Sequence, residues 1–199
     1  MAGEENDMGA LPLEKEDPYY TYADYKEWEL VEGERYEIMN GEAYAMSAPN
    51  TKHQIILGEL FNQFYNSLKG KPCRPIIAPY DVRLFYEEDE SDDTVVQPDL
   101  MVICDKAKIG PEGCRGAPDL VIEILSPSNT AIEMQLKFDL YHEAGVREYW
   151  VINPENNVLT VYYLGNNGID IKKYKNTDIV SVKVLPGLNI SMEQVFAEV

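Results

Sequence analysis

One apolar segment constrains the fold of this chain more than any other part of its sequence. Residues 118–125 are apolar except for Asp119 and Glu123, which is the composition of a buried β-strand. A carboxylate within such a strand is costly to bury unless it is paired, hydrogen-bonded or bound to a metal ion. The segment therefore predicts a buried sheet with a polar site at Glu123.

The sequence before this segment predicts a hairpin, a helix and further strands. Asn40-Gly41 is the dipeptide that best tolerates the positive φ angles of a tight turn, so residues 35–47 are expected to form two short strands. Asn50 can cap a helix with apolar residues at helical spacing until Gly70 ends it. Strands are expected next over residues 74–86 and 94–104, with an exposed acidic turn over residues 87–93 between them. A mobile Gly-rich loop is expected after them, over residues 105–116.

The sequence after the segment predicts a second helix and more strands. Thr130-Ala-Ile-Glu133 has the form of a capping box, and Gly145 should end the helix. Ile132, Leu136 and Leu140 would line its buried face. Strands are expected over residues 146–153, 158–163 and 180–184. The order of elements predicts an α/β fold with a central mixed sheet flanked by helices, an N-terminal β-hairpin and extra C-terminal strands.

The chain length fits one domain. A chain of 199 residues can bury one sizeable core, so we expect a single domain over residues 18–199. Residues 1–17 carry six acidic side chains and one lysine, which predicts a disordered acidic tail and not a signal peptide. No apolar run is long enough for a membrane span. Cys73, Cys104 and Cys114 are odd in number, which argues against a disulfide framework and favours a cytoplasmic location.

Distances along a strand identify a partner for Glu123. Asp119 is on the same side of the strand, but four residues separate the two by about 13 Å, too far for one ion to bridge. A neighbouring strand lies about 4.8 Å away, and Asp99, directly after Pro98, is the natural candidate on it. Two carboxylates that leave positions open for water and phosphate are how Mg²⁺ is usually held in phosphoryl-transfer sites. We therefore expect Asp99 and Glu123 to bind Mg²⁺.

A positive group near the two carboxylates is found on the second helix. Lys137 lies about 10 Å along the axis of that helix, within reach of a long side chain. A fixed cation there would stabilise the charge that a phosphodiester gains in its transition state, and would position the attacking water. The alternative is a structural role, with Lys137 solvated and Glu123 in an internal salt bridge. The residues alone leave both open.

Several ordered motifs resemble one family. The matching segments are Val96-Gln-Pro-Asp99-Leu, a Gly-rich loop, residues 117–128, Lys137 with Tyr141, and residues 145–154. Together with the hairpin that begins at Tyr36 and with His53, they look like the Uma-type (Uma-two) family of proposed restriction endonucleases. That family is similar to the wider PD-(D/E)-x-K nuclease superfamily. The likeness covers roughly residues 20–190, with several motifs in order.

The resemblance implies a Mg²⁺-dependent DNA endonuclease, with Mn²⁺ as a possible substitute ion. Asp99 matches the Asp of the first motif and Glu123 the acid of the second. The superfamily pattern has a lysine two residues after the acid, but Leu125 stands there, so Lys137 would take over that role. Glu37 matches an early acidic residue that could reach the metal directly or through water, although an exposed hairpin carboxylate is the plainer interpretation. A symmetric homodimer is also plausible for such a nuclease.

His53 is a further candidate for the site. It lies in the first turn of its helix with Ile56 and Leu57 three and four residues on, so it should face the core. A packed, hydrogen-bonded histidine is the common outcome there, and a place in the site is the alternative that the family match favours.

Net charge favours a rival function. The formal charge of −18 opposes DNA binding, which requires neutralisation of phosphates. Basic residues do gather locally, in Lys69-Lys71-Arg74, in residues 106–115 and in Lys172-Lys173-Lys175, although each group could be a solvated loop. The rival is therefore a catalytically inactive module that keeps the nuclease fold and binds protein or nucleic acid. A small-molecule hydrolase is disfavoured, because the chain has neither a phosphate-cradling Gly loop nor a nucleophile motif.

Overall fold

The strand that carries Glu123 lies inside a six-stranded mixed sheet. The computed structural model describes residues 19–28, 34–165 and 168–197, so the predicted tail over residues 1–17 lies outside the described residues. Only β9 and β10 are parallel in this sheet. The strand order is β12 (Gly168–Lys175), β11 (Val158–Gly165), β10 (Glu148–Asn153), β9 (Leu120–Ile124), β6 (Leu100–Ile103) and β3 (Arg74–Ile77).

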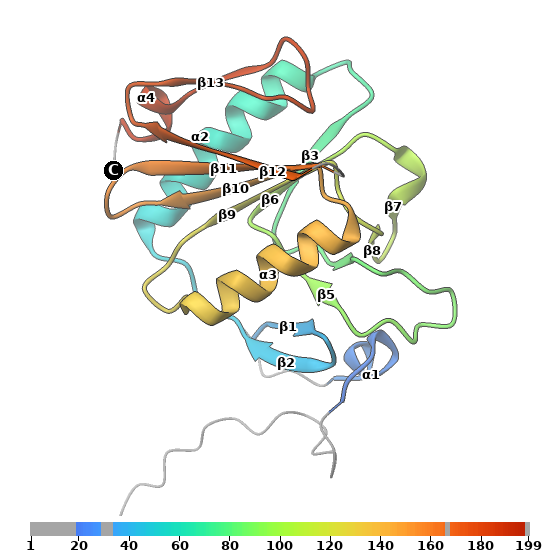
Figure 1. Ribbon diagram of the computed structural model, residues 1–199. Helices are drawn as coiled ribbons and strands as arrows, with labels where there is room; N and C mark the ends of the chain where they lie inside the picture. The colour runs from blue at the N-terminus through green and yellow to red at the C-terminus, as the bar shows by residue number, and fades with distance from the viewer. Residues whose placement is uncertain (1–18, 29–33, 166–167, 198–199) are drawn as a thin grey trace, which may run out of the picture.

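Two long helices cover opposite faces of this sheet (Figure 1). Because side chains alternate along each strand, alternate residues of one strand pack against different helices. Leu120, Ile122 and Ile124 of β9 pack with the apolar face of α2 (Thr51–Leu68). Val121, between them, packs on the other face with Leu140 and Tyr141 of α3 (Ala131–Ala144). Glu123 has the same parity as Val121 and therefore faces α3. The predicted mixed sheet flanked by helices is confirmed.

A second six-stranded sheet lies beside the α3 face and was not predicted. Its order is β2 (Glu42–Ala45), β1 (Tyr36–Met39), β5 (Val95–Val96), β4 (Val82–Arg83), β8 (Gly113–Arg115) and β7 (Ile109–Gly110). Two segments predicted as single strands are each divided between the sheets: residues 74–86 form β3 and β4, and residues 94–104 form β5 and β6. Pro79 and Pro98 lie at the two breaks, and proline cannot donate a hydrogen bond to a sheet. The chain therefore passes between the sheets directly before Asp99.

The turns and helix ends follow the sequence signals. Asn40 and Gly41 adopt φ angles of 51° and 79° between β1 and β2, as predicted for the hairpin. The Asn50 side chain accepts a hydrogen bond from the His53 backbone N–H at the start of α2. Gly145 ends α3 in the left-handed conformation with a φ of 92°. These local predictions are confirmed.

The Gly-rich segment 105–116 is an ordered part of the second sheet and not a mobile loop. It contains a short 3₁₀ turn (Lys106–Lys108) and the β7–β8 hairpin, and β8 pairs with β4. Gly113 has a φ of 142°, and a Cβ there would lie 2.4 Å from the Asp81 carbonyl oxygen. The glycine thus permits a close backbone approach, with the Cys114 N–H donating to Asp81 at 2.7 Å.

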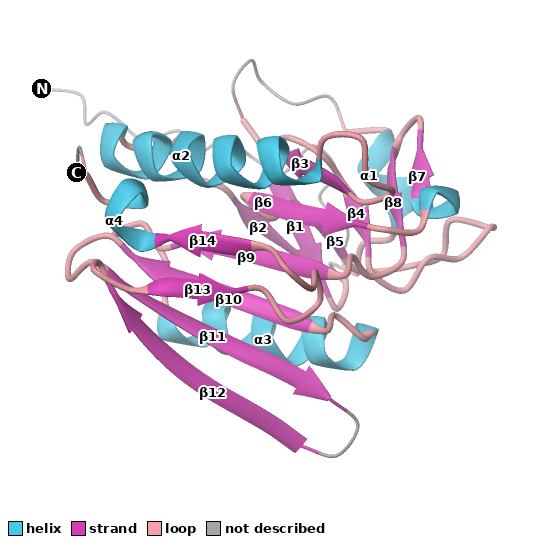
Figure 2. Cartoon of the chain, turned by 90° about the horizontal axis from the view of Figure 1, so that it is seen from above, coloured by secondary structure: helices cyan, strands magenta, loops and turns pink. Residues whose placement is uncertain are grey.

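The C-terminal region adds strands on the α2 side. The sheet of β13 (Ile179–Ser181) and β14 (Asn189–Ser191) and the short helix α4 (Met192–Val195) pack into the core that α2 covers. The lysines at 172, 173 and 175, interpreted from sequence as a solvated loop, lie on β12, an exposed strand at the edge of the sheet (Figure 2). None of the helices within the described residues has the length and hydropathy of a membrane span.

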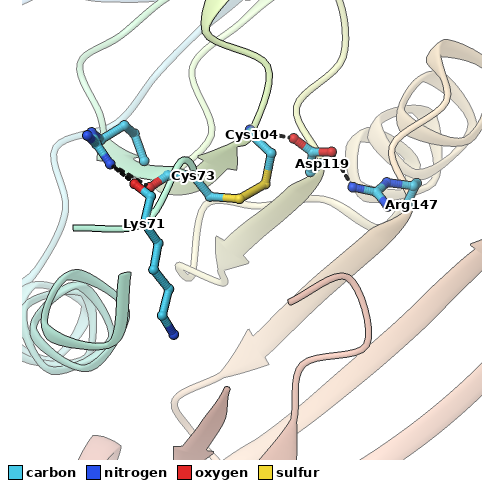
Figure 3. The surroundings of a disulfide bond; sticks show 6 residues. Lys71, Cys73, Cys104, Asp119 and Arg147 are labelled. Carbon is cyan, nitrogen blue, oxygen red and sulfur yellow. Dashed lines mark hydrogen bonds and ion pairs between the residues drawn. A yellow bond between two sulfur atoms is a disulfide. The ribbon is translucent and has the colours of Figure 1, made fainter. Parts of the chain in front are cut away.

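The prediction against a disulfide is wrong for one pair of cysteines. Cys73 and Cys104 form a disulfide across the ends of β3 and β6 (Figure 3), whereas Cys114 is a buried free thiol. Arg74 is the register partner of Ile103, which places the two cysteines opposite each other. Sequence counting could not find this pair because the contact depends on strands 31 residues apart.

Candidate active site

Glu123 is buried beneath α3 and accepts two hydrogen bonds. Its side chain is held between strand β9 and two residues of α3 that are one turn apart, Lys137 and Tyr141. Lys137 Nζ lies 3.1 Å and Tyr141 Oη 2.7 Å from Glu123 Oε1. Within the described chain both hydrogen bonds therefore fall on one oxygen, which leaves Oε2 available to an external ligand.

Lys137 joins Glu123 to a second carboxylate, that of Glu37. Lys137 is only 4% exposed, and its Nζ lies 2.8 Å from Glu37 Oε2 and 3.0 Å from Oε1. The Gln97 backbone N–H donates to Glu37 Oε1 at 2.7 Å. The plainer interpretation of Glu37, an exposed hairpin carboxylate, is therefore wrong: Glu37 on β1 is buried and faces the site. A solvated Lys137 is likewise contradicted, whereas the internal salt bridge of Glu123 in the same alternative is present, with Lys137 itself as the partner.

Asp99 lies beside Glu123 on the neighbouring strand. Leu100 is the register partner of Ile122, so Asp99, one residue earlier in this antiparallel pair, is opposite Glu123. Asp99 Oδ2 accepts the Ile124 N–H at 2.7 Å, and Asp99 Oδ1 lies 3.1 Å from His53 Nε2. His53 is buried as predicted, and of its two alternatives it takes the place in the site. The structure thus brings all five residues predicted for the site together.

Asp119 belongs to a different environment, as the distance argument predicted. It accepts the Cys104 N–H at 2.6 Å and forms an ion pair with Arg147, next to the Cys73–Cys104 disulfide (Figure 3).

A second group of polar residues supports the site, and two of its members, Asp81 and Tyr25, were missed by sequence reasoning. The Gln97 amide nitrogen donates to Asp81 at 2.9 Å and to the Tyr25 hydroxyl at 3.1 Å, and Tyr25 lies on α1 (Tyr22–Lys26). The Gln97 Oε1 atom and the His53 Nδ1 atom are buried without a hydrogen-bond partner among the described residues. Tyr141 had a usable signal, because it lies four residues after Lys137 on one helix face. Asp81 and Tyr25 had none, because they are distant in sequence.

Burial and the ion pairs shift the pKa values of the site in a consistent way. Burial raises the pKa of Glu123 to about 7, against the opposing attraction of Lys137. Burial lowers the pKa of Lys137, but the Glu123 and Glu37 carboxylates outweigh that effect and hold it above its usual value. Burial, reinforced by Glu123, raises the pKa of Tyr141 well above its usual value. These shifts favour a protonated Lys137 at neutral pH and bring the pKa of Glu123 near neutrality.

A cavity of about 120 Å³ opens at these residues. Its inner wall is formed by the side chains predicted for the site, namely Glu37, His53, Asp99, Glu123 and Lys137. Its rim is formed by the open end of the β1–β2 hairpin, by the loop before α2 and by the loop between β9 and α3. The buried ion pair is therefore not sealed, since an external ligand can reach it.

The oxygen atoms of the cavity fit Mg²⁺. Asp99 and Glu123 supply carboxylate oxygens from adjacent strands, and Gln97 Oε1 is a buried amide oxygen with no partner in the described chain. Mg²⁺ is usually bound by one or two carboxylates, with water and substrate phosphate at the remaining positions. No group of three or more His, Cys, Asp or Glu residues in the described segments is arranged to hold a metal alone.

Comparisons with known proteins agree with this architecture. Residues 22–193 match the model of the Uma2 family, which is described as "Putative restriction endonuclease". An uncharacterized protein of Synechocystis is 26% identical over 181 residues, which span 90% of this chain and 92% of that protein. The crystal structure of "a putative nuclease belonging to DUF820" from Anabaena variabilis superposes with a TM-score of 0.71 at 19% identity, over 89% of this chain and 98% of that chain. The predicted restriction-endonuclease-like fold is thereby confirmed.

Proposed function

The chain belongs to the Uma2 family, and from that membership we propose that it is a Mg²⁺-dependent endonuclease that hydrolyses DNA phosphodiester bonds. The observation that carries the proposal is the open cavity in which Asp99 and Glu123, from adjacent antiparallel strands, lie beside the buried cation of Lys137. Two carboxylates and a lysine at one cavity are the groups that metal-assisted phosphodiester hydrolysis requires.

Asp99 and Glu123 would hold the metal. When bound, Mg²⁺ supplies positive charge that polarises the phosphate and increases the acidity of its water. The Ile124 N–H and His53 fix the orientation of the Asp99 carboxylate through one oxygen each. Tyr141 and Lys137 fix Glu123 in the same way, through Oε1. The chain therefore holds both carboxylates in place before a ligand arrives, which lowers the cost of organising the site.

Lys137 would act as a fixed charge and not as a base. Its pKa is held above the usual value by Glu123 and Glu37, so it does not accept a proton at neutral pH. As a cation near the scissile phosphate it would stabilise the negative charge that develops in the transition state and orient the attacking water. Glu37, which lies on the other side of the lysine, would position Lys137 without contacting the substrate.

A binding module without catalytic activity is the second candidate. The observations that favour it are the net charge of −18 and the internal pairing of Lys137 with Glu123. The open cavity and the uncommitted Oε2 atom favour the enzyme, because a purely structural ion pair gains nothing from an opening to solvent.

Nicking of supercoiled plasmid DNA tests the choice between the two. The parent should nick DNA with Mg²⁺ or Mn²⁺ and be inactive with a chelator. Asp99→Asn and Glu123→Gln should lose activity by about 10²-fold or more, as expected when a group that binds charge in the transition state is removed. Asp119→Asn is the matched control: it removes a carboxylate just before the same strand, outside the cavity, and should retain the parent activity.

The outcomes separate the two functions. Equal nicking by the parent and both cavity variants would show that the activity does not arise at Asp99 and Glu123, and the proposal would fail. A parent that binds DNA or a protein but never cuts, with either metal, would establish the binding module.

A further inference from the structure

The rim of the cavity carries a cation, Arg35, that is not paired with any of the described residues. Arg35 lines the cavity and is half-buried, yet its guanidinium makes no ion pair or hydrogen bond with any residue in the described ranges. The other strong cation there, Lys137, is already paired with Glu37 and Glu123. A guanidinium that pairs with none of the described residues, in a chain of net charge −18, is suited to an incoming anion, and its planar donors fit a phosphate.

Three serines lie on the same rim and connect its two walls. The Arg35 carbonyl accepts the Met46 N–H at 2.8 Å, which places Arg35 beside Ser47 at the open end of the hairpin. Ser47 Oγ lies 2.6 Å from Ser128 Oγ, which is 2.7 Å from Ser126 Oγ. Ser47 comes from the loop between β2 and α2, and the other two come from the loop between β9 and α3. All four residues line the cavity.

Counting protons gives this serine chain a direction. Ser126 donates its only hydroxyl proton to Asn129 Oδ1 at 3.2 Å, so Ser128 must donate to Ser126 and Ser47 to Ser128. The Ser126 backbone N–H also donates to Asn129 Oδ1, at 2.8 Å, and keeps that end fixed. If the hydroxyl protons of Ser47 and Ser128 turn to a ligand, the two hydrogen bonds between the serines are given up, while the contacts of Ser126 with Asn129 stay in place.

We propose that Arg35, Ser47 and Ser128 form a binding subsite for a non-scissile phosphate of the nucleic-acid substrate, adjacent to the catalytic carboxylates. The proposal rests on the proposed function for the identity of the ligand. It also answers the charge objection: Glu133 on this rim, and the carboxylates inside, would repel a phosphate, and Arg35 is the local charge that offsets them. The subsite fixes the strand so that the next phosphate lies over Asp99 and Glu123.

Equilibrium binding without turnover tests the subsite. A short fluorescein-labelled DNA duplex is titrated in Ca²⁺, which takes oxygen ligands as Mg²⁺ does, and the dissociation constant is measured by anisotropy between about 50 and 200 mM salt. Arg35→Gln should weaken binding about 10- to 100-fold, as for loss of a hydrogen bond to a charged group. The slope of log K against log salt should fall by about 0.9, the value for one phosphate contact.

Two further variants complete the experiment. Arg74→Gln makes the same change of charge on β3, opposite Ile103 of β6 and outside the cavity, and should bind as the parent does. Ser128→Ala should weaken binding less than Arg35→Gln and leave the salt slope unchanged, because it removes no charge. If Arg35→Gln does not fold, Arg35→Lys decides: weaker binding with the parent salt slope supports the subsite, and unchanged binding overturns it.

The results also separate this proposal from the endonuclease itself. Parent-like binding by Arg35→Gln, equal weakening by Arg74→Gln, or a parent that binds no DNA would each overturn the subsite. A parent that nicks DNA while Arg35→Gln binds normally leaves the endonuclease intact without this subsite. Binding that depends on Arg35, in a parent that never cuts, keeps the subsite and removes the endonuclease.

Discussion

Replacement of Lys137 by methionine should destabilise the fold as well as stop catalysis. Lys137→Met keeps the length of the side chain but removes the charge between Glu37 and Glu123, which are both buried. Removal of one partner from a buried ion pair costs about 3–5 kcal/mol, because the remaining charge has no compensation. For a domain of this size each kcal/mol lowers Tm by about 2–4 °C, so we expect a decrease of about 6–20 °C.

The destabilisation should grow with pH, for a reason that the pKa of Glu123 supplies. Burial raises that pKa to about 7, above the ordinary value of 4.5, so the folded protein binds this proton more tightly than the unfolded chain. The stability linked to the proton is fully present below about pH 4.5 and is lost as the pH rises through the folded pKa. Without Lys137 the folded pKa must rise further. The difference between variant and parent should therefore be small near pH 5 and largest near pH 8.

Urea denaturation followed by circular dichroism, at about pH 5, 6.5 and 8, measures this difference. The double variant Glu37→Gln with Lys137→Met is the control, because it removes one of the two stranded carboxylates and should recover part of the loss. A pH-independent loss of stability would refute the reasoning, since it would mean that packing and not charge is responsible. A loss below about 1 kcal/mol at pH 8 would show that water already solvates the pair.

Three other results are expected. Mg²⁺ affinity measured by calorimetry should increase between about pH 6 and 8 with release of a proton, because the metal requires the ionised form of Glu123, whose pKa is about 7; affinity that is constant with pH would contradict this assignment. Arg83→Gln should lower the free energy of unfolding by about 3–5 kcal/mol in a urea titration, since it strands the buried Asp92, and a further Asp92→Asn change should restore part of it. Reduction of the Cys73–Cys104 disulfide should lower that free energy by about 3–4 kcal/mol from the closed-loop length, and a Cys73→Ser variant that is insensitive to reductant is the control.

Local sequence signals predicted the turns and helix ends because each depends on a few consecutive residues. Asn40-Gly41, Asn50 and Gly145 adopt the conformations that their side chains favour. The buried face of α3 was predicted correctly at Leu140 and incorrectly at Ile132, and it also contains a lysine that the apolar pattern did not indicate. Ile132, expected in the core, is 84% exposed, whereas Lys137, Leu140 and Tyr141 are buried.

The core of the site could be predicted from strand geometry, and its supports could not. Glu123 and Asp99 followed from the cost of a buried carboxylate and from the spacing of neighbouring strands. Glu37 was predicted from the family resemblance alone, because its place in the site depends on β1 belonging to a second sheet that lies against α3, and that pairing is set by contacts far apart in sequence. The Cys73–Cys104 bond was missed for the same reason.

Lys137 has a consequence for how this family can change over time. Glu37 belongs to one sheet and Glu123 to the other, so a single ammonium group fastens the two sheets together at the place where the proposed chemistry occurs. A relative that no longer cuts nucleic acid should not lose this lysine alone, because two buried carboxylates would remain unpaired between the sheets and the fold would be destabilised. Relatives that have lost the lysine, and with it the proposed activity, should therefore also have replaced Glu37 or Glu123.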